Sequence, residues 1–192
     1  MAFIVRPKHR LDDKIIEIYN PSGLVYSCVC LASSVNITTA RSQISYSLLR
    51  PRTCISLATI SISSINSEII LHGESEDNQN QNRAGSVTVI PTVLYDQACR
   101  VFTLPDSSSY IWTSSSKALY PLSKAAEELN TPLVRARLTA TRVWEFEFDP
   151  AAIDPVIVFA TAMVCMFDMW NCGPFYVGGL YWKPSDWNIA VL

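Results

Sequence analysis

The sequence predicts a mainly β protein, a closed antiparallel β-barrel of about 10–12 strands around a central hydrophobic C-terminal helix. Three observations lead to this fold class. Most of the chain alternates between apolar and polar residues, turn signals divide the alternation into short runs, and one late segment is apolar on every side. Hydrophobic residues make up 49% of the 192 positions and charged residues 17%. This composition argues against disorder and suits one domain over residues 1–192.

The period-two alternation is clearest in residues 133–142 and 144–148. In the second run, Trp144, Phe146 and Phe148 share one face and the two glutamates between them share the other, which is typical of half-buried antiparallel strands. Similar runs predict eight further strands, over residues 14–20, 24–32, 43–49, 54–63, 67–73, 86–95, 99–104 and 110–114. Because turn signals separate neighbouring runs, we expect mostly sequence-adjacent hairpins.

Two segments between these runs read differently. Residues 73–85 contain almost nothing apolar and predict a long exposed loop. Residues 123–130 favour a short helical turn or a loop.

The central helix is predicted over residues 154–170. Asp154 is a good N-cap residue, Pro155 suits the first helical position, and Gly173 and Pro174 follow the end. At about 1.5 Å per residue the apolar part of this helix, residues 155–167, is about 20 Å long, short of the roughly 30 Å hydrocarbon core of a bilayer. A helix that is apolar all round must be surrounded. A single sheet covers only one side, whereas a closed barrel covers every side.

The beginning of the chain and the lack of a long apolar run indicate a cytoplasmic protein. Met1–Arg10 does not look like a secretory signal, and no run reaches the roughly 20 apolar residues of a membrane span. The six cysteines are therefore expected as reduced thiols. Cys28 and Cys30 are the only closely spaced cysteines in the sequence, and the chain has only two histidines, so we expect no metal and no cofactor.

Three segments, in order and spacing, resemble the tubby C-terminal-like superfamily. They are residues 18–28 (IYNPSGLVYSC), residues 100–112 (RVFTLPDSSSYIW) and the segment from Asp154 to Asp168. In the second segment the resemblance rests on Arg100, Phe102, Thr103, Asp106, Tyr110 and Trp112. The chain is most similar to a fungal tubby-like family of unknown function, common in mushroom-forming fungi. Phospholipid scramblases and plant LURP-one-related proteins share the architecture.

The resemblance implies strands closed around a C-terminal helix. It also implies lipid binding, because tubby proteins hold phosphoinositides with basic side chains on the outer face of the barrel. The chain departs from the family after the helix, where Met169 and Trp170 precede an aromatic C-terminal extension, residues 171–192.

Charge is unevenly distributed along the chain. The net charge of −2 offers no case for nucleic acid. Residues 1–52, however, hold seven Lys or Arg against three acids, whereas residues 53–192 hold eight against fourteen. The basic part could meet phosphate groups or an anionic membrane surface, or it could be ordinary solvated charge.

The candidate ligand-binding residues are arginines near turns or on strand faces, and aromatic residues of the extension. They are Arg50, Arg52, Arg135, Arg137, Phe175, Tyr176, Tyr181, Trp182 and Trp187. Arginine makes paired hydrogen bonds to phosphate or carboxylate groups, although solvated strand faces explain the same residues. The aromatic extension could pack back on the barrel, line a hydrophobic site or form a dimer contact.

The candidate catalytic residues are His72 and Asp168. His72 ends a predicted strand and could act as a general base, or it could be an ordinary exposed histidine. Asp168 ends an apolar helix, where burial would raise its pKa and suit it to proton transfer. Hydrogen bonding to nearby backbone is the alternative role for Asp168.

Three classes of function remain open. The first is a binding module for a lipid or other hydrophobic small molecule, with possible peripheral membrane contact. The second is a small cofactor-independent enzyme, a cyclase or isomerase of a hydrophobic natural product in secondary metabolism. The third is a protein-interaction domain that forms a homodimer. The expected partner is a hydrophobic small molecule or an anionic lipid, and no nucleic acid.

Overall fold

The computed structural model describes residues 1–9, 12–36, 41–63, 66–72, 85–94, 96–122, 131–140 and 143–170. Within these ranges it contains twelve strands and one helix, α1 (Pro155–Asp168). The strands are β1 (Ala2–His9), β2 (Asp12–Asn20), β3 (Gly23–Asn36), β4 (Arg41–Arg50), β5 (Ile55–Ser63), β6 (Ser67–Leu71), β7 (Gly85–Leu94), β8 (Gln97–Thr103), β9 (Ser109–Thr113), β10 (Ala118–Pro121), β11 (Val134–Leu138) and β12 (Trp144–Phe148).

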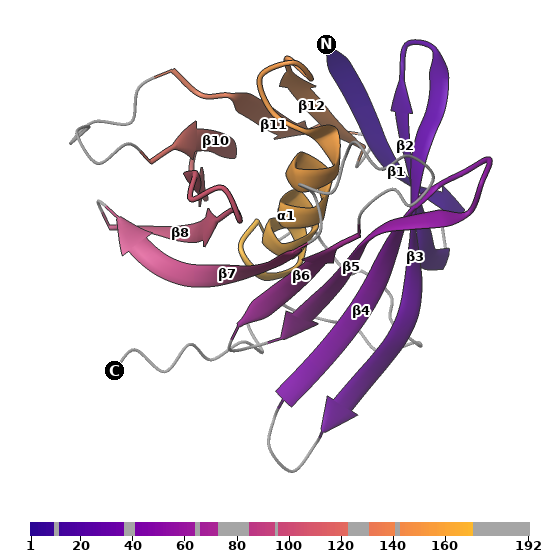
Figure 1. The fold of residues 1–192 in the computed structure, drawn as a ribbon, viewed down its shortest axis with the longest axis horizontal. Helices are drawn as coiled ribbons and strands as arrows, with labels where there is room; N and C mark the ends of the chain where they lie inside the picture. The colour runs from indigo at the N-terminus through magenta and orange to yellow at the C-terminus, as the bar shows by residue number, and fades with distance from the viewer. Residues whose placement is uncertain are drawn as a thin grey trace.

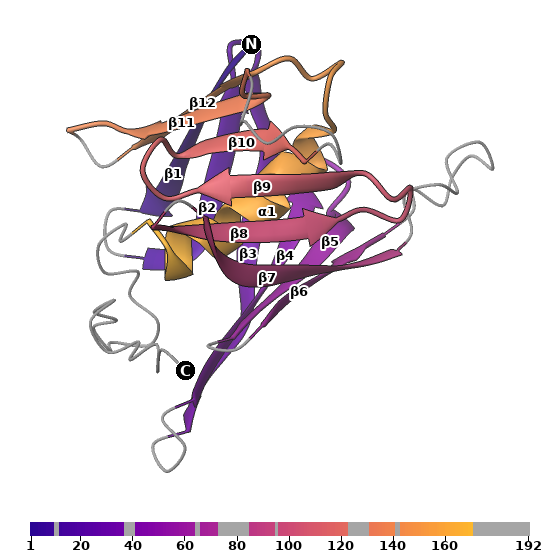
Figure 2. The same cartoon turned by 90° about the vertical axis from the view of Figure 1, so that its left-hand side faces the viewer.

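The twelve strands form one closed antiparallel barrel (Figures 1 and 2). Every strand pairs with its neighbours in sequence, and β1 closes the sheet by pairing with β12, Phe3 opposite Phe146. The predicted fold class is therefore confirmed. Closure leaves the barrel wall without open edges, except where one strand outruns its neighbour.

All ten predicted strands are present, β12 with the predicted ends and the others with shifted ends, and the structure adds β1 and β10. In β1, Phe3 and Val5 are buried while Ile4 between them is exposed, so an apolar residue on the outer face hides the alternation. The short β10 has only four residues and ends in a proline. Neither strand shows the clean period-two pattern on which the sequence prediction depends.

The helix begins as predicted and ends two residues before the predicted limit. The Asp154 carboxylate accepts a hydrogen bond from the Val156 N–H at 2.9 Å, and Pro155 follows the cap directly. At the other end, the Cys165 carbonyl accepts hydrogen bonds from the N–H groups of both Met169 and Trp170. These bonds close the last turn after Asp168.

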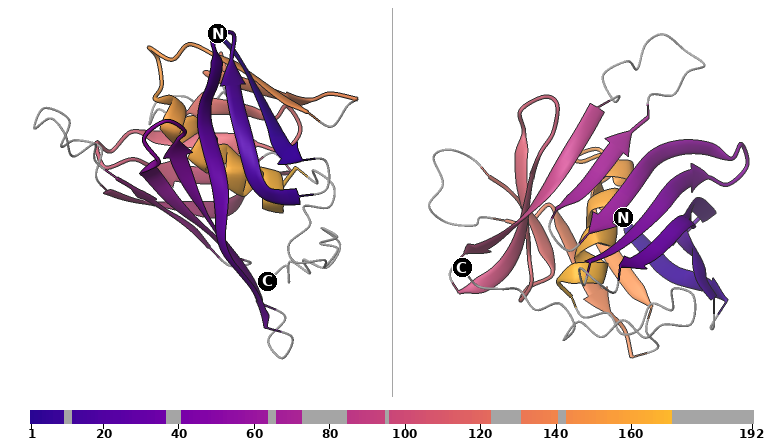
Figure 3. Two further views of the ribbon diagram at one scale, coloured as in Figure 1. Left: turned by 90° about the vertical axis from the view of Figure 1, so that its right-hand side faces the viewer. Right: turned by 90° about the horizontal axis from the view of Figure 1, so that it is seen from below.

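The helix lies inside the barrel, and strands surround it (Figures 1 and 3). Buried side chains occur all round its axis: Val156, Val158, Phe159, Ala160, Thr161, Ala162, Met163, Val164, Cys165 and Met166. Phe159 contacts four aromatic rings of the wall, Phe3, Tyr26, Phe146 and Phe148, with centroids 5.3–5.9 Å away. The helix is therefore the core on which the strands pack. Nowhere in the described part of the chain is a helix both long and apolar enough to span a membrane.

The up-and-down order of the strands places alternate connections at opposite ends of the barrel. The helix enters after β12, at the end that also carries the β2–β3 and β4–β5 connections. It finishes at the end where β8 begins and β9 stops. We call these the entry end and the exit end, and they fix where each candidate side chain lies.

Candidate functional site

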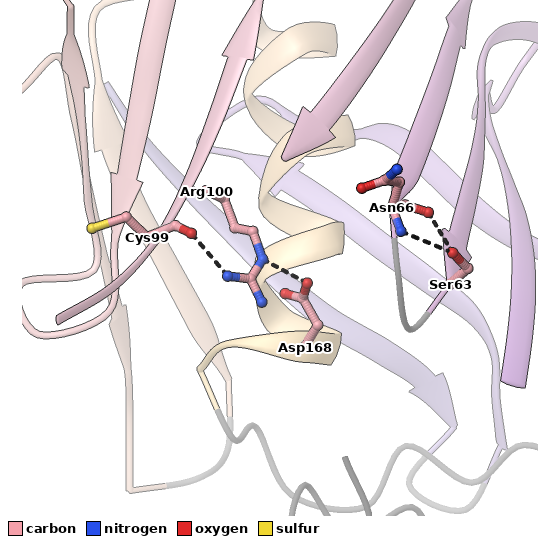
Figure 4. Close-up of polar contacts among 5 residues, drawn as sticks. All are labelled: Ser63, Asn66, Cys99, Arg100 and Asp168. Carbon is pink, nitrogen blue, oxygen red and sulfur yellow. Dashed lines mark hydrogen bonds and ion pairs between the residues drawn. The ribbon is translucent and has the colours of Figure 1, made fainter. Parts of the chain in front are cut away.

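Arg100 and Asp168 form a buried ion pair at the exit end (Figure 4). Arg100 lies on the inner face of β8, in register with Trp112 on β9. Its Nε donates to Asp168 Oδ2 at 2.7 Å, and its Nη1 donates to the Cys99 carbonyl at 2.8 Å. The two side chains are only 7% and 8% exposed. The pair therefore joins the end of α1 to the barrel wall.

Two features of the surroundings shift the pKa of Asp168 in opposite directions. Burial raises the pKa of the Asp168 carboxyl group above its ordinary value, and the adjacent Arg100 guanidinium partly offsets this increase. Among the described residues, its second oxygen, Oδ1, is buried without a hydrogen-bond partner. The predicted rise in pKa is thus present, while the ion pair occupies the other oxygen of the carboxyl group.

Three tryptophans pack together at the exit end, beside the Arg100–Asp168 ion pair. Trp112 Nε1 donates to the Thr161 hydroxyl at 3.0 Å, and Trp170 Nε1 donates to the Thr113 carbonyl at 3.1 Å. The Trp170 ring packs edge-on against Trp112 and is stacked on Trp144, with centroids 5.2 and 5.1 Å away. Since buried indole N–H groups need a partner, these contacts fix the rotation and depth of the helix.

Sequence reasoning did not connect Arg100 with Asp168. The sequence pattern that could have indicated this pair is the alternation in β8, which puts Arg100 on the same inner face as Phe102. An arginine on an inner face needs a carboxylate partner, and Asp168 is the only acid in α1.

His72 lies away from Asp168. Its Nε2 is 2.9 Å from the Thr59 hydroxyl, and Thr59 is in register with Ile70, an exposed outward residue. His72 follows β6 at the entry end, on the outer face of the wall. The two candidate catalytic residues are thus not brought together.

Arg135 and Arg137 lie on the outer face of β11, opposite two glutamates of β12. Arg135 is in register with Glu147 and Arg137 with Glu145, and Arg137 makes an ion pair with Glu145. Their positive charge is therefore balanced locally, which weakens the attraction of this face for an anion.

Arg50 and Arg52 lie elsewhere, at the β4–β5 turn of the entry end, and both are exposed. The five candidate aromatic residues of the extension fall outside the described residues.

The basic N-terminal part of the sequence becomes one continuous region of the wall. Residues 1–52 supply β1, β2, β3 and β4, which are consecutive in the barrel order, and we call these four strands the basic wall. Among the side chains that the structure describes, its exposed cations are Arg6, Lys8 and Arg50, with Arg52 in the turn just after β4, and its exposed apolar residues include Ile4, Leu24 and Leu31. The Arg6 guanidinium lies 4.6 Å from the centre of the Tyr19 ring. Cationic and apolar groups thus share one outer surface.

The remaining candidate chemistry is limited. The five cysteines in the described ranges are free, and burial raises the pKa of the Cys28 thiol, which keeps it protonated. In the same part of the chain, no three His, Cys, Asp or Glu side chains are grouped to hold a metal ion.

Together these features define a helix-filled antiparallel β-barrel with a basic outer wall. No protein-family model matches the chain, and neither curated proteins nor solved structures gave a match.

Proposed function

We propose that this protein is a non-catalytic binding module for anionic lipids, and that the basic wall is its binding surface. The observation that carries the proposal is the charge of that wall. Residues 1–52 hold seven basic and three acidic residues, a formal charge of +4, in a chain whose total is −2. Of these basic residues, Arg6, Lys8, Arg50 and Arg52 are exposed on or next to strands that are adjacent in the barrel, so these four cations lie on one side of it.

The filled interior supports an external binding surface. Side chains of α1 occupy the barrel on every side, so a ligand bound there would have to displace the core. Ile4, Leu24 and Leu31 offer apolar contact beside the cations, which suits a lipid surface better than a free anion. The resemblance to the tubby C-terminal-like superfamily points the same way, since tubby proteins within it bind phosphoinositides with basic side chains on the outer face of the barrel.

Vesicle binding tests the proposal. Wild-type protein should sediment with phosphatidylcholine vesicles that contain about 30% phosphatidylserine, and much less with neutral vesicles. Each basic residue near an anionic surface contributes about 1 kcal/mol, so Arg6→Gln/Lys8→Gln should weaken binding by about 2 kcal/mol, roughly 30-fold. Arg50→Gln/Arg52→Gln should have a similar effect. About 0.5 M salt should abolish most of the binding.

Arg135→Gln/Arg137→Gln is the matched control, because it removes the same charge from a face where two glutamates oppose the arginines. It should leave binding within about threefold of wild type. Equal loss in all three double variants would show that net charge alone attracts the protein. Wild-type protein that ignores anionic vesicles at low salt would refute the proposed function.

A further inference from the structure

A β-bulge on the basic wall turns one large apolar side chain toward solvent. In the pairing of β3 with β4, Cys30 lies opposite Tyr46 and Ala32 lies opposite Ser45, the next residue of β4. Leu31 is therefore the extra residue of the bulge. Its side chain is 59% exposed, more than any other large apolar side chain described in β1–β4. Since bulges often re-aim a side chain at a functional surface, the exposure of Leu31 follows from the backbone and not from a loose rotamer.

The outer face beside Leu31 is also apolar. Val29 of β3 and Ile15 of β2 lie opposite each other, and both are half-buried. The next pair, Cys28 and Ile16, is buried in the core, so Val29 and Ile15 face outward by alternation. The distal part of the β3–β4 hairpin projects beyond the rest of the barrel and extends the wall at the exit end (Figures 1 and 2). Leu31 thus belongs to an apolar strip of the wall.

An exposed cation, Lys8, lies in the same part of the wall. Pro7 of β1 is opposite Ile16 of β2, and Ile16 is opposite Cys28 of β3. Because β1 and β3 run in the same direction, Lys8 is one residue and Leu31 three residues beyond this row, toward the exit end. Neighbouring strands are about 4.8 Å apart, which places the two residues roughly 12 Å from each other. One patch of surface therefore offers a cation to a headgroup and a leucine to acyl chains.

We propose that Leu31 inserts into the acyl-chain region of an anionic membrane when the basic wall docks on it. This inference rests on the proposed function and adds the residue that anchors the wall. The cations attract the surface and are screened by salt, whereas the leucine gains by leaving water. A single leucine is too small to hold the protein at a membrane without the cations, so high salt should still release it.

Sedimentation with vesicles tests whether Leu31 contributes to binding. With phosphatidylcholine vesicles that contain about 30% phosphatidylserine, Leu31→Ser should bind about tenfold more weakly than wild type, because it loses the burial of one leucine side chain. Val93→Ser is the matched control, since Val93 on β7 is 73% exposed and lies outside the basic wall. This variant should bind like wild type.

Fluorescence quenching tests insertion directly. When bound to the same vesicles with bromine atoms on their acyl chains, Leu31→Trp should lose a larger fraction of its tryptophan fluorescence than wild type does. Val93→Trp should be quenched no more than wild type. Circular dichroism should show that all four variants fold, because both positions are exposed. If Leu31→Ser does not fold, the quenching of Leu31→Trp decides.

The outcomes separate this inference from the proposed function. Wild-type protein that does not bind anionic vesicles would overturn both. Wild-type protein that binds no better than folded Leu31→Ser would overturn the role of Leu31 and leave the basic wall as the binding surface. Quenching of Leu31→Trp that does not exceed that of Val93→Trp would have the same consequence.

Discussion

Replacing Arg100 with methionine should destabilise the protein by about 3–5 kcal/mol in unfolding free energy. The guanidinium faces Asp168 at 2.7 Å, and both side chains are more than nine-tenths buried. Methionine fills much of the same volume but leaves the carboxylate without its counter-charge. A buried charge that loses its partner costs far more than the pair itself contributes. Urea denaturation followed by tryptophan fluorescence measures the change.

Two further variants identify the cause. Arg137→Met breaks an ion pair with Glu145 on the outside of the same barrel, where the arginine is 79% exposed. Its effect should stay below about 1 kcal/mol. The double variant Arg100→Met/Asp168→Leu removes both charges and should recover most of the loss. If Arg100→Met costs no more than Arg137→Met, the pair does not hold the helix end.

The effect of Arg100→Met should also depend on pH. Burial raises the folded-state pKa of Asp168, so the folded state binds this proton more tightly than the unfolded state does. The stability that this tighter proton binding contributes is present at low pH and is lost as the pH rises through the raised pKa. Arg100 lowers this pKa, and its removal should raise the pKa further. The loss of unfolding free energy should therefore be larger at neutral pH, where Asp168 is charged, and should shrink as acidification protonates its carboxyl group.

Phe159→Ala should also cost about 3–5 kcal/mol, because it opens a cavity at the centre of the barrel. Phe159 is 1% exposed and touches rings from β1, β3 and β12. Phe159→Leu keeps part of this volume and should lose less.

Val93→Ala on β7, where the side chain is 73% exposed, is the control and should stay within about 0.5 kcal/mol. Equal effects at Phe159 and Val93, measured by thermal and urea denaturation, would contradict a helix packed inside the barrel.

The fold could be read from the sequence because its two main signals are local. Asp154 and Pro155 mark the start of the helix, and Trp144, Phe146 and Phe148 show the inner face of a strand by alternation alone. The strand β1 was not predicted, because the exposed apolar residue Ile4 interrupts the same alternation. Closure was inferred from the surroundings that an all-round apolar helix requires.

The site could be predicted only in part, because it depends on contacts between distant residues. The raised pKa of Asp168 follows from its place in the sequence, but its partner Arg100 lies 68 residues earlier. The alternation of apolar and polar residues predicts that Arg100 faces inward, but it does not predict which turn of the helix Arg100 contacts. The glutamates opposite Arg135 and Arg137 were visible in the sequence, yet their facing positions depend on strand register.

Hydrogen exchange tests the central claim, that α1 is the core of the barrel. Measured on the protein in solution, the amides of residues 158–166 should exchange among the slowest in the chain. Their opening free energy should equal that of β5 and β12, so that they exchange only when the whole barrel unfolds. Helix amides that exchange much faster than those of the paired strands would show that the barrel stands without its helix, and would contradict this account.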